Sequence, residues 1–177
     1  MGIMTNYRVF PAAAALAILC GQCFAAVEVS KIRWQVPARQ SVAHGEKFAD
    51  ASELLFSTDS AKPPRFAVAA GLVNNGARSA EASIVRCAFS FRLIKLSDPA
   101  KPGVWAVPFM TEERRISKIK PGMAFEIKIR NVDIKPFLSR LRASGYWPDA
   151  VKVQLMVEPR PGDELTVTEA VIPVNYR

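Results

Sequence analysis

Apolar and polar residues alternate along most of the chain that follows residue 26. In the clearest run, between Val151 and Val157, the odd positions hold Val or Leu, and Lys152 and Gln154 lie between them. Successive side chains of a β-strand point to opposite faces of its sheet, so this pattern predicts strands with one buried face. We expect such strands at 32–36, 66–72, 85–93, 104–110, 116–119, 125–130, 151–157 and 165–174.

Residues typical of turns separate these runs. They form the segments Asn74-Asn75-Gly76, Ser97-Asp98-Pro99, Pro121-Gly122 and Pro161-Gly162-Asp163. Asn and Gly tolerate positive φ, so we expect the first of these turns to use that conformation. Many short strands at this spacing predict an all-β fold, an antiparallel sandwich of about seven strands.

One segment has helical spacing instead. Its apolar residues lie at 134, 137, 138 and 141, and Gly145 follows as a stop signal. The pattern predicts one short connecting helix over 133–142, with Asp133 as its N-cap and Pro136 in its first turn.

Two of the predicted strands and their turns resemble the immunoglobulin-like modules of bacterial extracytoplasmic proteins. In such modules a strand that ends in Asn-x-Gly pairs into the core, and a Pro-Gly turn opens a later strand. Here the matching segments are 66–76, 119–122 and 125–127. The resemblance covers about residues 65–174 and implies an immunoglobulin-like β-sandwich for adhesion, assembly or scaffolding, without catalysis. The Cys–Trp–Cys core of antibody domains is absent.

The amino terminus has the three parts of a secretory signal peptide. Arg8 is the only charged residue before Glu28, an apolar stretch follows it, and small residues end the segment. We therefore predict cleavage after Ala25 or Ala26 and an exported, periplasmic or extracellular protein. The alternative is a retained membrane anchor, because the 19 uncharged residues from Val9 to Val27 are long enough to span a bilayer.

After a signal peptide at 1–26, the chain has the length of one domain. We expect an amino-terminal strand and an irregular segment at 27–64, and the main part of a single β-sandwich at 65–177. Within the first of these, residues 53–56 fit a strand or a helical turn equally well.

Catalytic and metal-binding residues are scarce. Signal removal leaves Cys87 as the one cysteine, and His44 is the one histidine of the chain. Cys87 has the same strand parity as Val85 and Phe89, which predicts a small buried hydrophobe. His44 lies in a predicted loop without a partner pattern. No phosphate loop, zinc spacing or calcium loop occurs, so we expect no enzyme, no cofactor and no metal.

Positive charge concentrates in one stretch. The chain carries +8, the predicted mature part +7, and residues 114–142 alone an excess of seven. The nine cations of this stretch are Arg114, Arg115, Lys118, Lys120, Lys128, Arg130, Lys135, Arg140 and Arg142. If they form one face, it would attract an envelope protein or an anionic envelope polymer. The alternative is that they protect an exposed edge strand and keep the protein soluble.

These features favour an exported, non-catalytic binding or assembly module of the cell envelope. Nucleic acid is not an expected partner, because no stacking aromatic residues are interleaved with the cations. The alternative function is carbohydrate binding by aromatic residues in or near loops, namely Trp105, Tyr146 and Trp147. Trp34 lies in an alternating strand and is expected in the core. The oligomeric state stays open.

Overall fold

The computed structural model describes residues 26–38, 47–56, 65–129, 132, 134–158 and 165–176. Residues 1–25, His44, Arg130, Asp133 and the predicted turn at Pro161 lie outside this part of the chain. Among the described residues, no helix is both long enough and apolar enough to cross a bilayer.

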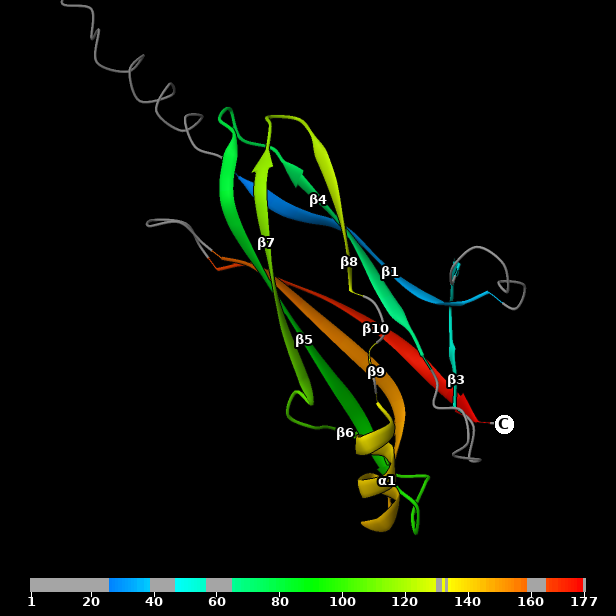
Figure 1. The fold of residues 1–177 in the computed structure, drawn as a ribbon. Helices are drawn as coiled ribbons and strands as arrows, with labels where there is room; N and C mark the ends of the chain where they lie inside the picture. Colours follow the sequence, from blue (N-terminus) through cyan, green and yellow to red (C-terminus); the bar gives the residue numbers. More distant parts are fainter. Residues whose placement is uncertain are drawn as a thin grey trace, which may run out of the picture.

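Two β-sheets pack face to face (Figure 1). The four-stranded sheet has the order β2–β1–β4–β8, formed by β2 (Phe48–Asp50), β1 (Val27–Pro37), β4 (Ala67–Asn74) and β8 (Ala124–Ile129). The six-stranded sheet has the order β3–β10–β9–β5, followed by β6 and β7 along the other edge of β5. Its strands are β3 (Leu54–Phe56), β10 (Val167–Tyr176), β9 (Tyr146–Val157), β5 (Ala80–Lys95), β6 (Val104–Trp105) and β7 (Met110–Ile119). The helix α1 (Lys135–Ala143) connects β8 to β9.

The division of strands between the sheets confirms the predicted immunoglobulin-like sandwich. β1, β4 and β8 occupy the places of strands A, B and E of that fold, and β5, β9 and β10 those of C, F and G. The described residues form ten strands rather than about seven, because three of them are only two or three residues long. One pairing departs from the antiparallel expectation: β3 runs parallel to β10.

A break separates β6 from β7, where the sequence pattern predicted one strand over 104–110. Trp105 pairs with Arg92 and Met110 pairs with Phe89, so this side of the ladder holds two extra residues. Pro108 lies inside the break and has no N–H to donate to the ladder. After the break β7 continues to Ile119, and it therefore includes the strand expected at 116–119.

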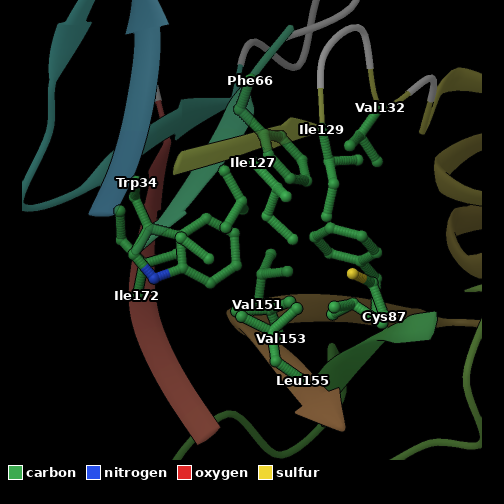
Figure 2. Close-up of a cluster of buried hydrophobic side chains, with 14 of the residues drawn as sticks. Trp34, Phe66, Cys87, Ile127, Ile129, Val132, Val151, Val153, Leu155 and Ile172 are labelled. Carbon is green, nitrogen blue, oxygen red and sulfur yellow. The ribbon is translucent and has the colours of Figure 1, made fainter. Parts of the chain in front are cut away.

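The core lies between the two sheets and is built around three rings. Trp34, Phe66 and Phe89 form a triangle with ring centroids 5.6–6.4 Å apart. Alternate residues of β5, β8, β9 and β10 surround it, and Figure 2 shows the sulfur of Cys87 among them. The burial of Trp34 and Cys87 confirms their predicted positions in the core.

Asn74 is a buried polar residue that joins several segments at one end of the sandwich. Its side-chain Nδ2 donates to the carbonyl oxygens of Arg78 (2.7 Å) and Ile119 (2.9 Å). Its Oδ1 accepts from the backbone N–H groups of Gly76 (3.0 Å) and Ala26 (3.2 Å). One amide therefore connects the start of β1, the β4–β5 loop and the end of β7.

The turn after Asn74 does not use the positive φ that the sequence predicted. Among the described residues, only Ala82, Gly122 and Gly145 have positive φ. Asn74 instead completes β4 and holds the turn through its side chain. Gly122, with φ +68° after Pro121, has the geometry that a type II turn requires.

The helix α1 confirms the predicted helical segment. Leu138 and Ile134 are buried, and Phe137 and Leu141 pack against the core cluster. The N-cap is Ile134, which makes no side-chain cap bond, whereas the predicted cap, Asp133, lies outside the described residues. Gly145 has φ +75° just after the helix, as its predicted role as a stop requires.

We expect Asn74→Ala to lower the free energy of unfolding by about 3 kcal/mol, because it leaves buried carbonyl and N–H groups without partners. Asn75→Ala is the matched control: Asn75 is exposed, and its side chain donates only to Glu28. The control should change the stability by less than about 0.5 kcal/mol. Urea unfolding measures both variants, and equal losses would contradict the role given to Asn74.

Burial raises the pKa of the Cys87 thiol from 9.0 to about 12. Between these two pH values, the Cys87 thiol is therefore protonated in the folded protein and ionised in the unfolded chain. This stabilising contribution is complete below pH 9 and is lost as the pH rises from 9 to about 12. Cys87→Ala should be less stable at neutral pH but should lose less stability between these pH values. Urea unfolding at several pH values in that range measures the stability of both proteins. A parallel loss of stability in the two would contradict the raised pKa of the Cys87 thiol.

Candidate functional site

The structure describes eight of the nine predicted cations, all except Arg130, and places them on different parts of the molecule. Arg114, Arg115 and Lys118 lie on β7, Lys120 on the β7–β8 turn, Lys128 on β8, and Lys135, Arg140 and Arg142 on α1. β7 and β8 belong to different sheets. Figure 1 shows α1 at the end of the sandwich opposite the β7–β8 turn. These residues therefore do not share one face, because the chain runs the length of the sandwich between them.

Acidic neighbours compensate several of the cations on β7 and β8. Arg114 forms an ion pair with Glu112. The Nζ atom of Lys118 lies 2.8 Å from Glu81, and that of Lys128 lies 3.1 Å from Glu126. β7 pairs only with β5 among the described strands, so its other edge is open. The charged side chains of β7 also disfavour the pairing of another strand with this edge.

Positive charge gathers instead at the end of the sandwich that carries α1. The described segments there, 89–109 and 134–149, hold six cations and two acids. The cations are Arg92, Lys95, Lys101, Lys135, Arg140 and Arg142, and the acids are Asp98 and Asp149. This excess of four is half of the net charge of the whole chain, +8. The charge pattern along the chain does not reveal this excess, because half of these cations come from a segment about 40 residues before the helix.

A groove of about 230 Å³ lies at this end, between α1 and the break that separates β6 from β7. Seven of the nine residues that line it are apolar. The lining consists of Phe91, Leu93, Ala106, Val107, Phe109, Phe137, Arg140, Leu141 and Ser144. Phe109 forms its floor: it stacks on Phe91 with the ring centroids 4.1 Å apart and contacts Phe137 at 5.1 Å.

Exposed aliphatic side chains continue the apolar surface around the groove. Val107, in its wall, is 83% exposed. Val104 is 72% exposed and pairs with Leu93, a lining residue. Leu96 is 50% exposed, and its backbone N–H donates to Gly145 just after α1. Exposed apolar side chains gathered near one groove mark a binding region more often than scattered exposed residues do.

A second surface occupies the outer face of the six-stranded sheet, around Trp105. The Nζ atom of Lys152 lies 4.9 Å from the Trp105 ring centroid, and the guanidinium carbon of Arg92 lies 5.9 Å from it. Arg92 also donates two hydrogen bonds, of 2.8 and 2.9 Å, to Asp149, the extra residue of a β-bulge in β9. A Cβ atom at Gly103 would lie 2.9 Å from Arg92 Cγ, so only glycine fits beside this pair.

The same face contains a hollow of about 560 Å³. It is lined by Arg86, Cys87, Ala88, Thr111, Glu112, Glu113, Gln154, Met156 and Val167. Glu169 connects the hollow to the Trp105 cluster, because it accepts from Gln154 and forms an ion pair with Lys152 at 3.5 Å. The hollow and the exposed ring therefore belong to one continuous surface.

The three aromatic residues predicted to bind carbohydrate do not form one platform. Trp105 is 36% exposed, and Tyr146 is also exposed. Trp147 is only 8% exposed, since its ring packs against Tyr176 with the centroids 5.0 Å apart. The structure thus removes Trp147 from any exposed site and leaves Trp105 on the sheet face that contains the hollow.

Within the described segments, no three His, Cys, Asp or Glu side chains gather as a metal ion would require. His44 lies outside those segments, and the Cys87 thiol is buried.

Comparison with known proteins finds no matching family model and no matching curated protein. Among solved structures, the fold is similar to part of a β-glucosidase from Listeria innocua, with a TM-score of 0.39 and 10% identity. That match covers 86% of this chain, which spans 16% of the length of the enzyme. The ligand-binding region of serine-glutamate repeat protein A of Enterococcus faecium matches with a TM-score of 0.27 and 13% identity. This second match covers 67% of this chain and 82% of the ligand-binding region. Likenesses this distant carry no conclusion about function.

We expect acrylamide to quench one of the three tryptophans efficiently, because only Trp105 is substantially exposed. Trp105→Phe should remove most of the quenchable emission, whereas Trp147→Phe should leave it in place. Steady-state quenching measures both variants. A large loss in the Trp147→Phe protein would show that this ring is accessible after all.

Proposed function

We propose that this protein is an exported, non-catalytic binding module of the cell envelope, and that it engages its partner at the α1 end of the sandwich. The observation that carries the proposal is the coincidence, at one end, of an exposed apolar groove and an excess of four positive charges. The partner is an envelope protein or an anionic envelope polymer.

The two features have complementary physical roles. Burial of apolar surface in the groove supplies affinity, at about 25 cal/mol for each Å² removed from water. The surrounding cations attract a negatively charged partner over a distance of about 10 Å or less in physiological salt and orient its approach. Of the predicted cations that the structure describes, Lys135, Arg140 and Arg142 are the ones at this end.

Arg115 and Lys120 have no acidic partner within the described part of the chain, but they lie away from the groove. They serve in this proposal as surface charges that favour solubility and long-range attraction. Export rests on the charge and apolar pattern of residues 1–26, which is that of a signal peptide.

A second candidate function, carbohydrate binding, is favoured by one observation. Trp105 is exposed on the same sheet face as a hollow of about 560 Å³, whose lining includes the polar side chains of Arg86, Glu113 and Gln154. Exposed aromatic rings can stack on sugars, and neighbouring polar groups can then bond the hydroxyls. Such binding would be insensitive to salt and would quench Trp105 fluorescence.

The proposal predicts a partner that stays bound at low salt and leaves as the salt concentration rises. The test isolates the carboxyl-terminally tagged protein from its own envelope and washes it with increasing salt. The variant Arg140→Gln/Arg142→Gln should lose the partner at lower salt than the wild type. Arg115→Gln/Lys120→Gln removes the same charge elsewhere and is the matched control.

Three results would count against this function. The first is equal loss of the partner from both double variants, which would indicate non-specific charge attraction. The second is a partner retained at all salt concentrations by the α1 variant. The third is the absence of any partner together with salt-independent sugar binding that Trp105→Ala abolishes, which would favour the carbohydrate function instead.

A further inference from the structure

The groove beside α1 has a composition that restricts what can fill it. We infer that it binds an acidic, amphipathic segment of a partner protein, with one bulky apolar side chain in the groove and neighbouring carboxylates on Arg140. This inference rests on the proposed function and specifies the chemistry of the partner.

The size and lining of the groove fit a single large side chain. Its volume, about 230 Å³, exceeds that of a cavity of about 150 Å³ known to hold a benzene molecule. Phe109 in its floor contacts the rings of two further lining residues, Phe91 and Phe137. Aromatic and aliphatic walls favour a Leu, Ile, Phe or Trp side chain over any polar group, which would lose its hydrogen bonds to water there.

The positive charge around the groove favours a partner that carries carboxylates. Arg140 belongs to the groove lining and has no acidic partner among the described residues. The two acids that the structure describes at this end are already engaged, Asp98 with Lys101 at 2.7 Å and Asp149 with Arg92 at 2.8 Å. An incoming carboxylate therefore meets an arginine that no acid of the described segments compensates, and charge-assisted hydrogen bonds of this kind are the stronger ones.

Other anionic partners fit the groove less well. A polysaccharide or a phosphate polymer offers no side chain for an apolar floor. A phospholipid offers an acyl chain about 15 Å long, half the thickness of the hydrocarbon core, which is more than a groove of this volume accommodates. A protein segment supplies the apolar group and the carboxylates from adjacent residues.

The experiment selects from a displayed library of random peptides on the full chain as isolated from its envelope. Enriched peptides should be acidic and contain at least one bulky apolar residue. One of them, labelled with fluorescein, is then measured by anisotropy. Arg140→Glu and Val107→Glu should each weaken its binding by about tenfold or more, since one reverses the charge and the other places a carboxylate in the groove wall. Lys120→Glu, at the other end of the sandwich, should not change the affinity.

Enrichment of neutral or basic peptides, or no enrichment, would overturn the inference. So would an acidic peptide whose affinity is unchanged by both groove variants. Vesicles of phosphatidylglycerol are tested in parallel: binding that depends on Arg140 in vesicles, without peptide enrichment, would assign the groove to lipid. If an envelope partner still depends on Arg140 and Arg142 while no acidic peptide is selected, the proposed function stands and only this inference fails.

Discussion

The buried amide of Asn74 is the contact on which the arrangement of the two sheets depends. The chain crosses between the sheets after β4 and again after β7, and both crossings occur at the end where this residue lies. Asn74 bonds to both crossings and to Ala26 at the start of β1, with every polar atom of its side chain engaged. A residue that joins so many segments fixes their relative positions, and hence the alignment of the core strands below them.

The opposite end depends on aromatic packing instead. Phe89 belongs to the central ring cluster, Phe109 contacts Phe89 at 6.3 Å, and Phe137 contacts Phe109 at 5.1 Å. This row of rings connects the core to α1 through the break between β6 and β7. The groove is therefore a continuation of the core that the helix leaves partly uncovered, which explains why Phe91 in it is buried while Val107 in its wall is exposed.

Local sequence patterns predicted the features that residues close together in the chain determine. Alternation found the buried faces of β5, β8 and β9, including Cys87, and helical spacing found α1. The patterns could not show that the segment of Lys95 and Leu96 lies beside the end of α1, because the two segments are about 50 residues apart in the chain. Nor could they show that Trp147 would be covered by Tyr176, or that the side chain of Asn74 would replace a positive φ, since partners distant in sequence decide both.

The position of β1 sets the distance between the start of the sandwich and the groove. β1 begins at the Asn74 end, whereas the groove lies beside α1, and β5 runs between these ends with 16 residues. At about 3.3 Å for each residue, the strand spans roughly 50 Å. Leu93 in the groove lies 13 residues beyond Ala80, so anything that holds the start of β1 presents the groove roughly 40 Å away, and the sandwich acts as a spacer as well as a support.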